Sequence, residues 1–354
     1  MSLPIIGITC GDTNGVGPEL IIESLSNKEV LDILTPVIFG PAAVFKEVKK
    51  QLGQNDFQYQ VVQDINNLRP GKIYFYNCND NQNVSFGEPT QESGQNAKDA
   101  LLTAGAYLKK KEIGALVTAP IDKSNIQGDG FQYPGHTEFL NALDPSNTGL
   151  MLMMHKNLRI AMYSGHIPLS EASASLNKED LSRKILALSK VMQQDFAVRK
   201  PKIAVLGINP HAGDNGLLGK EDQEIILPVI NELKEKGNTV FGPFPADGFF
   251  GNNMQKDFDC VLAMYHDQGL IPFKSISFGE GTNFTSGLDF IRTSPDHGTA
   301  FDIAGKGKAS NTSFNQALFN ALSILRTRGL HLEASENILK SQPERRSKKA
   351  AMNR

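Results

Sequence analysis

The sequence has few cysteines, no excess of charge of either sign and no long apolar run. Its three cysteines, Cys10, Cys78 and Cys260, are far apart and form no C-x-x-C pair. A sparse, odd set argues against a disulfide framework and is typical of the reducing cytoplasm. Because 36 Lys and Arg balance 38 Asp and Glu, the overall charge supports neither a nucleic-acid nor a membrane partner.

No segment has the features of a membrane span or an ordinary signal peptide. The N-terminal apolar stretch lacks a basic region and is interrupted by Pro4 and Gly7, which argues against secretion. No other apolar run is long enough to cross a bilayer. We therefore expect a cytoplasmic protein, and 354 residues favour two domains.

The common nucleotide-binding motifs are also missing. No G-x-G-x-x-G follows a predicted strand, and no Walker-type loop is present. The chain has instead a glycine-containing segment from Asp296 to Lys308. Its small residues would let a ligand approach the backbone closely, and Asp302 could accept hydrogen bonds. A tight loop without a ligand is the alternative interpretation.

Short apolar runs alternate with longer amphipathic ones along the chain. The runs predict strands at Ile5–Thr9, Val37–Phe39, Ile73–Tyr76, Ala115–Thr118, Leu150–Met154, Arg159–Tyr163, Ile203–Ile208 and Val261–Met264. Several are apolar throughout, as in strands buried on both faces of a parallel sheet. Helical spacing is found at 225–233 and 314–325, and Pro18 suits the first turn of a helix through Glu19–Leu25. The alternation predicts an α/β fold with mostly parallel sheets.

Three histidines share one position relative to these predicted strands. His166, His211 and His266 each come shortly after a strand, and ligands of open parallel sheets bind beyond the carboxyl ends of strands. Three imidazoles there would bind a catalytic divalent metal. Asp267 and Asp247 could fix the imidazole tautomers. The alternative is that each histidine is an ordinary loop or capping residue.

Two further segments have the residue types of an anion site. Thr137, in Gly135-His136-Thr137-Glu138, precedes an apolar helical pattern and is predicted to be a helix N-cap. Lys274, Asn283 and Arg292 stand in loop-like sequence among glycines, where cations can close on a phosphate. Each residue taken singly also fits a capping or solvated role.

Several motifs in the same order resemble the 4-hydroxythreonine-4-phosphate dehydrogenase family of vitamin B6 biosynthesis, from Gly11 to about Gly329. The motifs are Gly11-Asp-Thr-Asn-Gly-Val-Gly-Pro-Glu19, Thr118-Ala-Pro-Ile-Asp-Lys123, Gly135-His-Thr-Glu138, Asn209-Pro-His-Ala-Gly213, Tyr265-His-Asp-Gln-Gly269, Ile291-Arg-Thr-Ser294 and Asp296-His-Gly-Thr-Ala300. The sequence departs from the family at Thr13-Asn14, where Pro-Ala is commoner, and at Gly248, where threonine is commoner.

The resemblance implies an isocitrate/isopropylmalate dehydrogenase-like fold with two α/β/α domains and an active site in the cleft between them. We expect a first domain at 1–130 plus about 295–340, a second at 131–294, and a basic tail at 341–354. It also implies a homodimer in which one metal ligand comes from the second subunit. The implied site residues are His166, His211 and His266 for metal; His136, Thr137, Lys274, Asn283 and Arg292 for phosphorylated substrate; Asp247 and Asp267 for support and catalysis; and Gly298 and Asp302 for cofactor.

The implied activity is metal-dependent oxidation of 4-phosphooxy-L-threonine by NAD or NADP. The product, 2-amino-3-oxo-4-phosphooxybutanoate, would lose carbon dioxide to give 3-amino-2-oxopropyl phosphate. Zinc, cobalt, manganese and magnesium all remain open as the metal. One alternative is a related enzyme that oxidises threonate or erythronate 4-phosphate, and another is a non-catalytic metal- or phosphate-binding protein.

Overall fold

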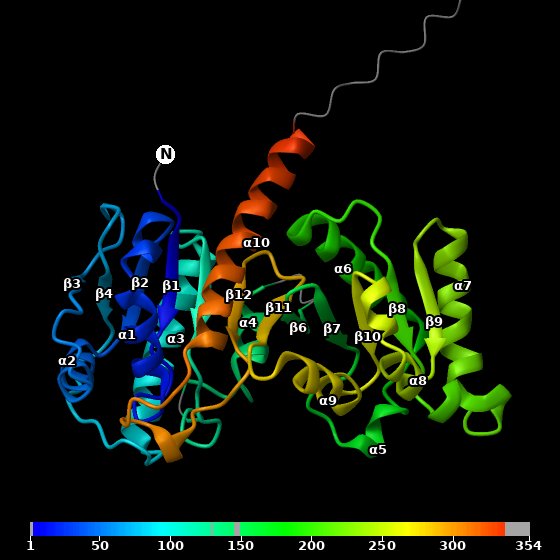
Figure 1. The fold of residues 1–354 in the computed structure, drawn as a ribbon, viewed down its shortest axis with the longest axis horizontal. Helices are drawn as coiled ribbons and strands as arrows, with labels where there is room; N and C mark the ends of the chain where they lie inside the picture. The colour runs from blue at the N-terminus through cyan, green and yellow to red at the C-terminus, as the bar shows by residue number, and fades with distance from the viewer. Residues whose placement is uncertain (1–2, 129, 145–148, 337–354) are drawn as a thin grey trace, which may run out of the picture.

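The computed structural model describes residues 3–128, 130–144 and 149–336, and strands alternate with helices through most of them (Figure 1). The predicted tail 341–354 lies outside the described residues. The strands are β1 (Ile5–Thr9), β2 (Thr35–Gly40), β3 (Gln60–Val62), β4 (Tyr74–Asn77), β5 (Ala115–Thr118), β6 (Leu150–His155), β7 (Leu158–Met162), β8 (Ile203–Leu206), β9 (Val240–Phe244), β10 (Cys260–Ala263), β11 (Thr282–Ser286) and β12 (Arg292–Pro295).

The helices cover this sheet and connect its strands. They are α1 (Gly17–Ser26), α2 (Ala42–Gln51), α3 (Gln91–Lys109), α4 (His136–Leu143), α5 (Leu169–Ala172), α6 (Lys178–Phe196), α7 (Leu227–Glu235), α8 (Ala246–Gly251), α9 (His266–Ser277) and α10 (Thr312–Glu336). Shorter helical turns are η1 (Lys28–Asp32), η2 (Pro210–Gly216), η3 (Asp222–Ile226), η4 (Met254–Asp257) and η5 (Phe301–Ile303). None of the helices described is long and apolar enough to span a membrane.

A single 12-stranded sheet runs through both predicted domain ranges, in the order β3-β4-β2-β1-β5-β12-β11-β6-β7-β10-β8-β9. Its neighbours are parallel except at β12/β11, β11/β6 and β6/β7. One half of the sheet, β3, β4, β2, β1, β5 and β12, therefore runs in one direction, and the other half, β7, β10, β8 and β9, runs in the opposite direction. The reversal occurs at the central strands β11 and β6. The predicted α/β class with mostly parallel strands is confirmed, whereas the domain boundaries stay a prediction.

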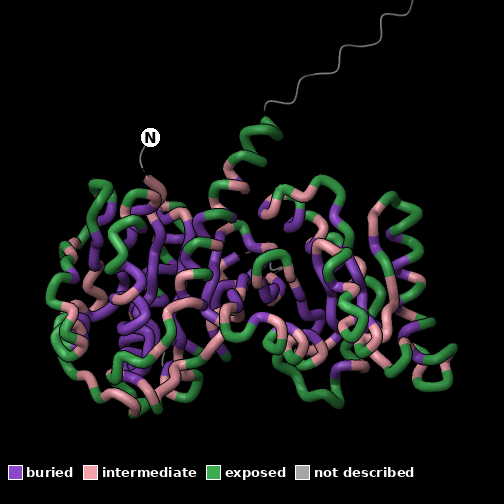
Figure 2. The backbone as a smooth tube through the Cα atoms, in the orientation of Figure 1, coloured by how far each residue is buried: buried purple, intermediate pink, exposed green. Residues whose placement is uncertain are grey.

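The predicted apolar strands are confirmed. Most of their predicted first and last residues agree with the observed ones to within one or two residues. These strands carry the buried core, as the buried segments through the centre of Figure 2 show. The helices predicted around Pro18 and around Phe314 are also found, as α1 and α10. Four strands were not predicted, namely β3, β9, β11 and β12.

Two local predictions are wrong. Lys274, Asn283 and Arg292 do not lie in loops, because they belong to α9, β11 and β12 respectively. Thr137 is not an N-cap, because α4 begins at His136 and the capping position is Gly135, with no side-chain cap. β11 and β12 are polar in sequence and have no apolar pattern, and the described partners of Arg292 and Thr293 are contributed by other elements of the fold.

Side-chain alternation along β12 separates the helix-covered face of the sheet from the opposite face. The Thr293 hydroxyl donates to the Ala317 carbonyl oxygen of α10 at 2.8 Å. Arg292 and Ser294, its neighbours in the strand, line a cavity instead. Since successive side chains of a strand point to opposite faces, α10 covers one face of the central strands and the cavity lies over the other.

Candidate active site

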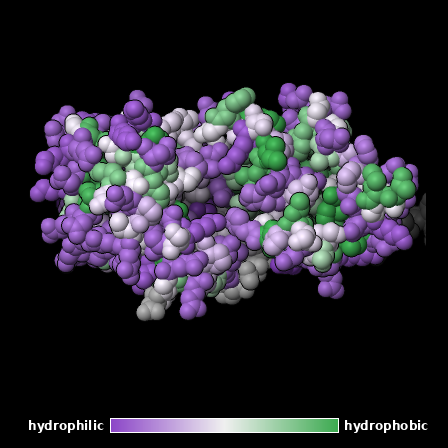
Figure 3. Space-filling view, turned by 90° about the horizontal axis from the view of Figure 1, so that it is seen from below, coloured by the Kyte–Doolittle hydropathy of each residue, from purple (hydrophilic) through white to green (hydrophobic). Residues whose placement is uncertain are grey.

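One cavity of about 280 Å³ lies over the central strands, between the two halves of the sheet. Seen from below, the molecule is hollowed between the halves, and hydrophilic side chains surround the hollow (Figure 3). The residues predicted from sequence that line the cavity are His136, Thr137, His166, His266, Lys274, Asn283, Arg292 and Gly298. Tertiary structure thus brings together most of the predicted site.

Arg292 places a buried positive charge in the lining of the cavity. The side chain is only 3% exposed, and its Nη2 and Nε donate to the Thr118 hydroxyl at 2.7 and 3.0 Å. Nη1 donates to the Thr285 hydroxyl at 3.2 Å. Burial lowers the pKa of Arg292 to about 9, and Glu138 opposes the shift, so the guanidinium is charged at pH 7.

Arg292 forms no ion pair with any of the described residues. No carboxylate oxygen among them lies within 4 Å of its guanidinium, although the charge of Glu138 is near enough to raise the pKa of Arg292. Its described hydrogen-bond partners are the neutral hydroxyls of Thr118 and Thr285. A buried cation is costly unless an anion compensates it. The cavity is therefore electrostatically suited to an anionic ligand.

Three more polar groups at the cavity lack partners. His136 Nε2, Asn283 Oδ1 and His297 Nε2 are all buried without a hydrogen bond in the structure. Burial, followed by the charges of Arg292 and Lys123, lowers the pKa of His136 well below its usual value, so this imidazole is neutral at pH 7. Unpaired buried groups beside a buried cation indicate a site that a ligand completes.

Two of the three predicted metal ligands lie together in the lining of the same cavity. The rings of His166 and His266 are 5.5 Å apart between centroids. His266 Nδ1 lies 2.6 Å from Asp267 Oδ1, and His166 Nδ1 lies 3.7 Å from Glu138 Oε1. Each Nδ1 thus faces a carboxylate, which favours a proton there and leaves Nε2 with a free lone pair.

His211 is not part of this cluster. It is exposed in η2 and does not line the cavity, and no group of three or more His, Cys, Asp or Glu among the residues described can bind a metal ion. Asp247 is likewise exposed, on α8, and away from the cavity lining. Within one chain, the sequence-predicted set is therefore only partly assembled.

The backbone around His211 is unusually strained. His211, Ala212, Asp214 and Asn215 all have positive φ, at 52°, 52°, 40° and 56°, a region that costs about 1–2 kcal/mol per non-glycine residue. Buried Asp222 stabilises the base of this segment, because its carboxylate accepts the backbone N–H of Ile208 and of Asn209 at 2.9 and 3.1 Å. Such strain, fixed by buried contacts, is typical of functional segments.

The predicted cofactor residues lie in the segment that follows β12. Gly298 is exposed and forms part of the cavity wall. Asp302 is exposed on η5, and its carbonyl oxygen accepts a hydrogen bond from Lys306 Nζ at 2.6 Å. The segment therefore borders the cavity, with an open backbone where a flat ligand can approach.

Several residues that line the cavity were not predicted as site residues. Thr118 holds Arg292, Glu138 faces His166, and Ser294 and Lys123 complete the wall. Glu138 follows Thr137 in the Gly135-His136-Thr137-Glu138 motif. No signal in the sequence indicates that it faces His166, because the two residues are remote in the chain and meet only through the fold.

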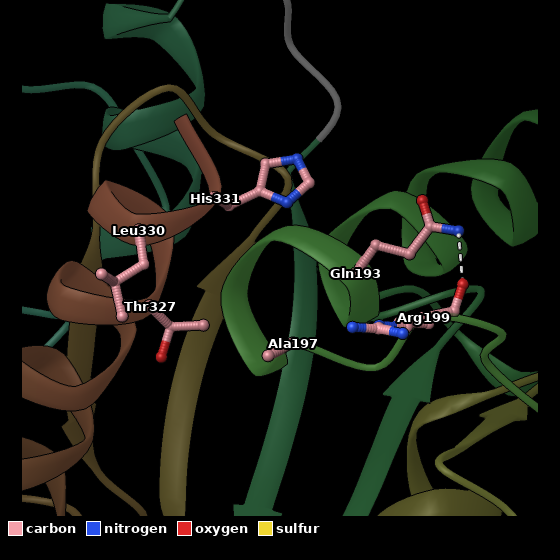
Figure 4. Close-up of a pocket in the computed structure, with 6 residues that line it drawn as sticks. All are labelled: Gln193, Ala197, Arg199, Thr327, Leu330 and His331. Atoms are coloured by element: carbon pink, nitrogen blue, oxygen red, sulfur yellow. Dashed lines mark hydrogen bonds between the residues drawn. The ribbon is translucent and has the colours of Figure 1, made fainter. Parts of the chain in front are cut away.

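A second cavity, of about 430 Å³, lies between the end of α6 and α10 (Figure 4). Its lining residues are Gln193, Ala197, Arg199, Thr327, Leu330 and His331. In Figure 4 their side chains come from two helices and the turn after α6, and the one hydrogen bond drawn joins Gln193 to the backbone of Arg199. This lining has no cluster of acid, base and metal-ligand groups like that of the central cavity.

The overall fold is that of the isocitrate dehydrogenase class. An isocitrate dehydrogenase from Methylococcus capsulatus superposes with a TM-score of 0.51 over 94% of this chain and 89% of its own, at 14% identity. At that identity the likeness is one of fold alone.

Sequence comparison then gives the family. A model of the family described as "Pyridoxal phosphate biosynthetic protein PdxA" matches residues 32–321, and the chain belongs to this family. A 4-hydroxythreonine-4-phosphate dehydrogenase from Bacteroides thetaiotaomicron is 43% identical over 95% of this chain and 93% of its own length. The crystal structure of a 4-hydroxythreonine-4-phosphate dehydrogenase from Klebsiella pneumoniae has a TM-score of 0.78 and 34% identity, covering 91% of this chain and 98% of the other.

Another relative carries a different substrate in its name. A protein from Oceanobacillus iheyensis named "Putative D-threonate 4-phosphate dehydrogenase" is 38% identical over 92% of this chain and 99% of its own length. Both substrate types considered from the sequence thus occur among the names of relatives.

Proposed function

We propose that this protein oxidises the secondary hydroxyl of 4-phosphooxy-L-threonine, with NAD or NADP as hydride acceptor and a bound divalent metal. The product is 2-amino-3-oxo-4-phosphooxybutanoate, which loses carbon dioxide to give 3-amino-2-oxopropyl phosphate. The supporting observation is the lining of one cavity, which combines a buried guanidinium that has no ion-pair partner among the described residues with two adjacent imidazoles.

We assign the phosphate of the substrate to the part of the cavity lined by Arg292 and by the buried polar groups that lack partners. Arg292 presents a planar set of donors suited to phosphate oxygens, and Lys274 adds a second charge from α9. His266, Leu270 and Lys274 recur every four residues, so they share one face of α9, which lines the cavity. His136, Thr137 and Asn283 complete the polar contacts to the substrate.

We assign the metal to the part of the cavity lined by the two imidazoles. His166 and His266 fit it because each Nδ1 faces a carboxylate and each Nε2 is available. A bound divalent ion would supply Lewis acidity that lowers the pKa of the substrate hydroxyl. Asp267 orients His266, and Asp247 is assigned a supporting role. Zinc, cobalt, manganese and magnesium are the candidate ions.

We further propose a homodimer in which the third imidazole is the partner's His211. In support, His211 is exposed on a strained segment next to Leu217 and Leu218, which are 79% and 42% exposed. Exposed leucines beside this strained segment favour contact with another protein surface, because such a contact removes them from water. The free cysteines support a cytoplasmic location.

The cofactor is assigned to the segment after β12. Gly298, at the cavity wall, leaves room for a nicotinamide ring near the substrate carbon, and Asp302 would bind farther along the dinucleotide. The chain's contribution to hydride transfer is then alignment of the two reactants in a site with little water.

The direct test is the metal-dependent reduction of NAD or NADP, followed at the absorbance of the reduced nicotinamide. We expect turnover with 4-phosphooxy-L-threonine after addition of a divalent metal, and loss of turnover with a chelator. The matched comparison uses D-threonate 4-phosphate, in which a hydroxyl group replaces the amine of 4-phosphooxy-L-threonine. A higher kcat/KM for the threonate would select the alternative substrate, and no reduction with either would contradict the dehydrogenase proposal.

A further inference from the structure

The segment from Asp296 to Gly307, called here the 296–307 loop, has little regular structure of its own. It leaves β12 at the cavity and contains only the short η5 turn before α10 begins at Thr312. A loop of this kind can present its backbone to a ligand in a fixed shape only if other parts of the chain hold it.

Glu19 provides such a contact from the far end of the sequence. This residue lies in the first turn of α1 and is fully buried. Its carboxylate accepts the backbone N–H groups of both Gly305 and Gly307, the latter at 3.1 Å. A carboxylate that accepts backbone amides makes charge-assisted hydrogen bonds, which are stronger than neutral ones.

The loop also packs too closely on this region for side chains to intervene. Val16 N donates to the Thr299 carbonyl oxygen at 3.0 Å. A Cβ built on Gly15 would lie 2.8 Å from that same oxygen, and one on Gly87 would lie 2.9 Å from the Phe301 oxygen. The loop therefore rests on the β1–α1 connection and on the segment before α3.

The neighbouring Asn14 joins these two supports. Its Oδ1 accepts the Ser85 backbone N–H at 2.9 Å, its Nδ2 donates to the Glu88 carbonyl oxygen at 2.8 Å, and its own carbonyl oxygen accepts Gly87 N–H at 2.9 Å. The motif at 11–19 is thereby bound to the segment before α3, and both segments support the 296–307 loop.

We propose that Glu19 is a positioning residue for the dinucleotide: its carboxylate holds the 296–307 loop in the shape that binds the cofactor. This rests on the proposed function, which places the dinucleotide against that loop. The proposed phosphate and metal ligands lie elsewhere, on β11, β12, α4, α9, the β7–α5 connection and η2. Glu19 therefore acts on one ligand of the site and leaves the others unchanged.

The test is Glu19→Gln in the full-length protein, which keeps the shape of the side chain but replaces one acceptor by a donor. We expect the Kd for NADH or NADPH, measured by nicotinamide fluorescence, to rise about tenfold or more. Hydrogen exchange of the 305–307 amides should accelerate. Metal content and the affinity for inorganic phosphate should stay at wild-type values.

The matched control is Glu23→Gln, one turn further along the same helix, since none of the described hydrogen bonds of Glu23 reaches the loop. If Glu19→Gln fails to fold, Gly15→Ala is the second variant, because its methyl group pushes on Thr299 without altering the carboxylate. It should weaken dinucleotide binding in the same way.

Three results would overturn the inference. Exchange of 305–307 that is unchanged in Glu19→Gln would mean that the carboxylate does not hold the loop. Faster exchange with unaltered dinucleotide affinity would mean that the loop does not position the cofactor. A wild-type protein that binds neither NADH nor NADPH would overturn the proposed function itself, and this arm separates the two failures.

Discussion

At the scale of single residues, the site is defined by polar groups whose partners are incomplete. Arg292 is the clearest case, because two threonine hydroxyls satisfy part of its hydrogen bonding and none of its charge. Asn14 is the opposite case. It differs from the residue that is commoner in the family, and its side-chain amide forms hydrogen bonds with Ser85, Glu88 and Thr90.

Replacing Arg292 should mainly weaken binding of the phosphorylated substrate. For Arg292→Ala we expect a loss of about 2 kcal/mol, or about thirtyfold in affinity, since a charge-assisted fork is removed. Arg292→Lys should recover part of the loss, because it retains the charge but not the planar donors. The measurement is the Kd for substrate and for inorganic phosphate. The control is Arg326→Ala on the exposed side of α10, and affinity equal to this control would remove Arg292 from the phosphate site.

At the scale of elements, α10 connects the two halves of the sheet. It packs on β12, β5 and β11 and also contacts α6. Its Arg328 forms a buried two-pronged pair with Asp195 of α6, with Nε–Oδ1 and Nη2–Oδ2 distances of 2.8 and 2.9 Å. Nη1 donates to the Leu288 carbonyl oxygen at 3.1 Å. The pair thus fixes α6 against the end of the helix that also covers β12.

Breaking this pair should destabilise the fold strongly. Asp195→Ala leaves the Arg328 charge buried without its partner, and we expect a loss of about 3–5 kcal/mol in the free energy of unfolding. Urea unfolding followed by circular dichroism measures it. The control is Glu232→Ala, which removes the exposed pair between Glu232 of α7 and Lys236, the residue after this helix, and should leave the transition unchanged. Identical midpoints for the two variants would contradict a structural role for the buried pair.

At the scale of the whole molecule, reversal of strand direction at the centre of the sheet shapes the cavity. The ends of β5 and β7 point in opposite directions, so the site lies over the face of the central strands rather than beyond one edge. His166 and His266 reach it from the second half, whereas His211 remains outside. A complete metal site as proposed therefore needs a second copy of the chain.

Subunit mixing tests this directly. His211→Ala and His266→Ala should each lose bound metal. A hybrid dimer of the two keeps one intact site, so an equimolar mixture after refolding should regain about a quarter of the wild-type metal content. The measurement is metal content by mass spectrometry after gel filtration. Mixing His166→Ala with His266→Ala is the control and should regain none, because both residues lie in the same chain's cluster. No recovery in the first mixture would contradict a shared site.

The sequence by itself determined the elements whose signal is local. Continuous apolar runs such as Ile203–Leu206 bury both faces of a strand, and the spacing of Phe314, Leu318 and Leu322 gives α10 its packed face. Nearest neighbours in sequence are enough to produce these patterns. The motifs likewise identified most of the residues that line the cavity, because ligand contacts constrain residue type.

Only the tertiary structure decided the rest, because the energies involved come from partners far apart in sequence. β11 and β12 form a strand pair at the centre of the sheet even though Thr282, Ser294 and Arg292 give them a polar sequence. Glu19 binds amides nearly the whole chain away, and His211 lies apart from the two imidazoles with which its strand-end position had grouped it. Pairing of buried polar groups and the direction of strands are properties of packing, which local sequence patterns do not encode.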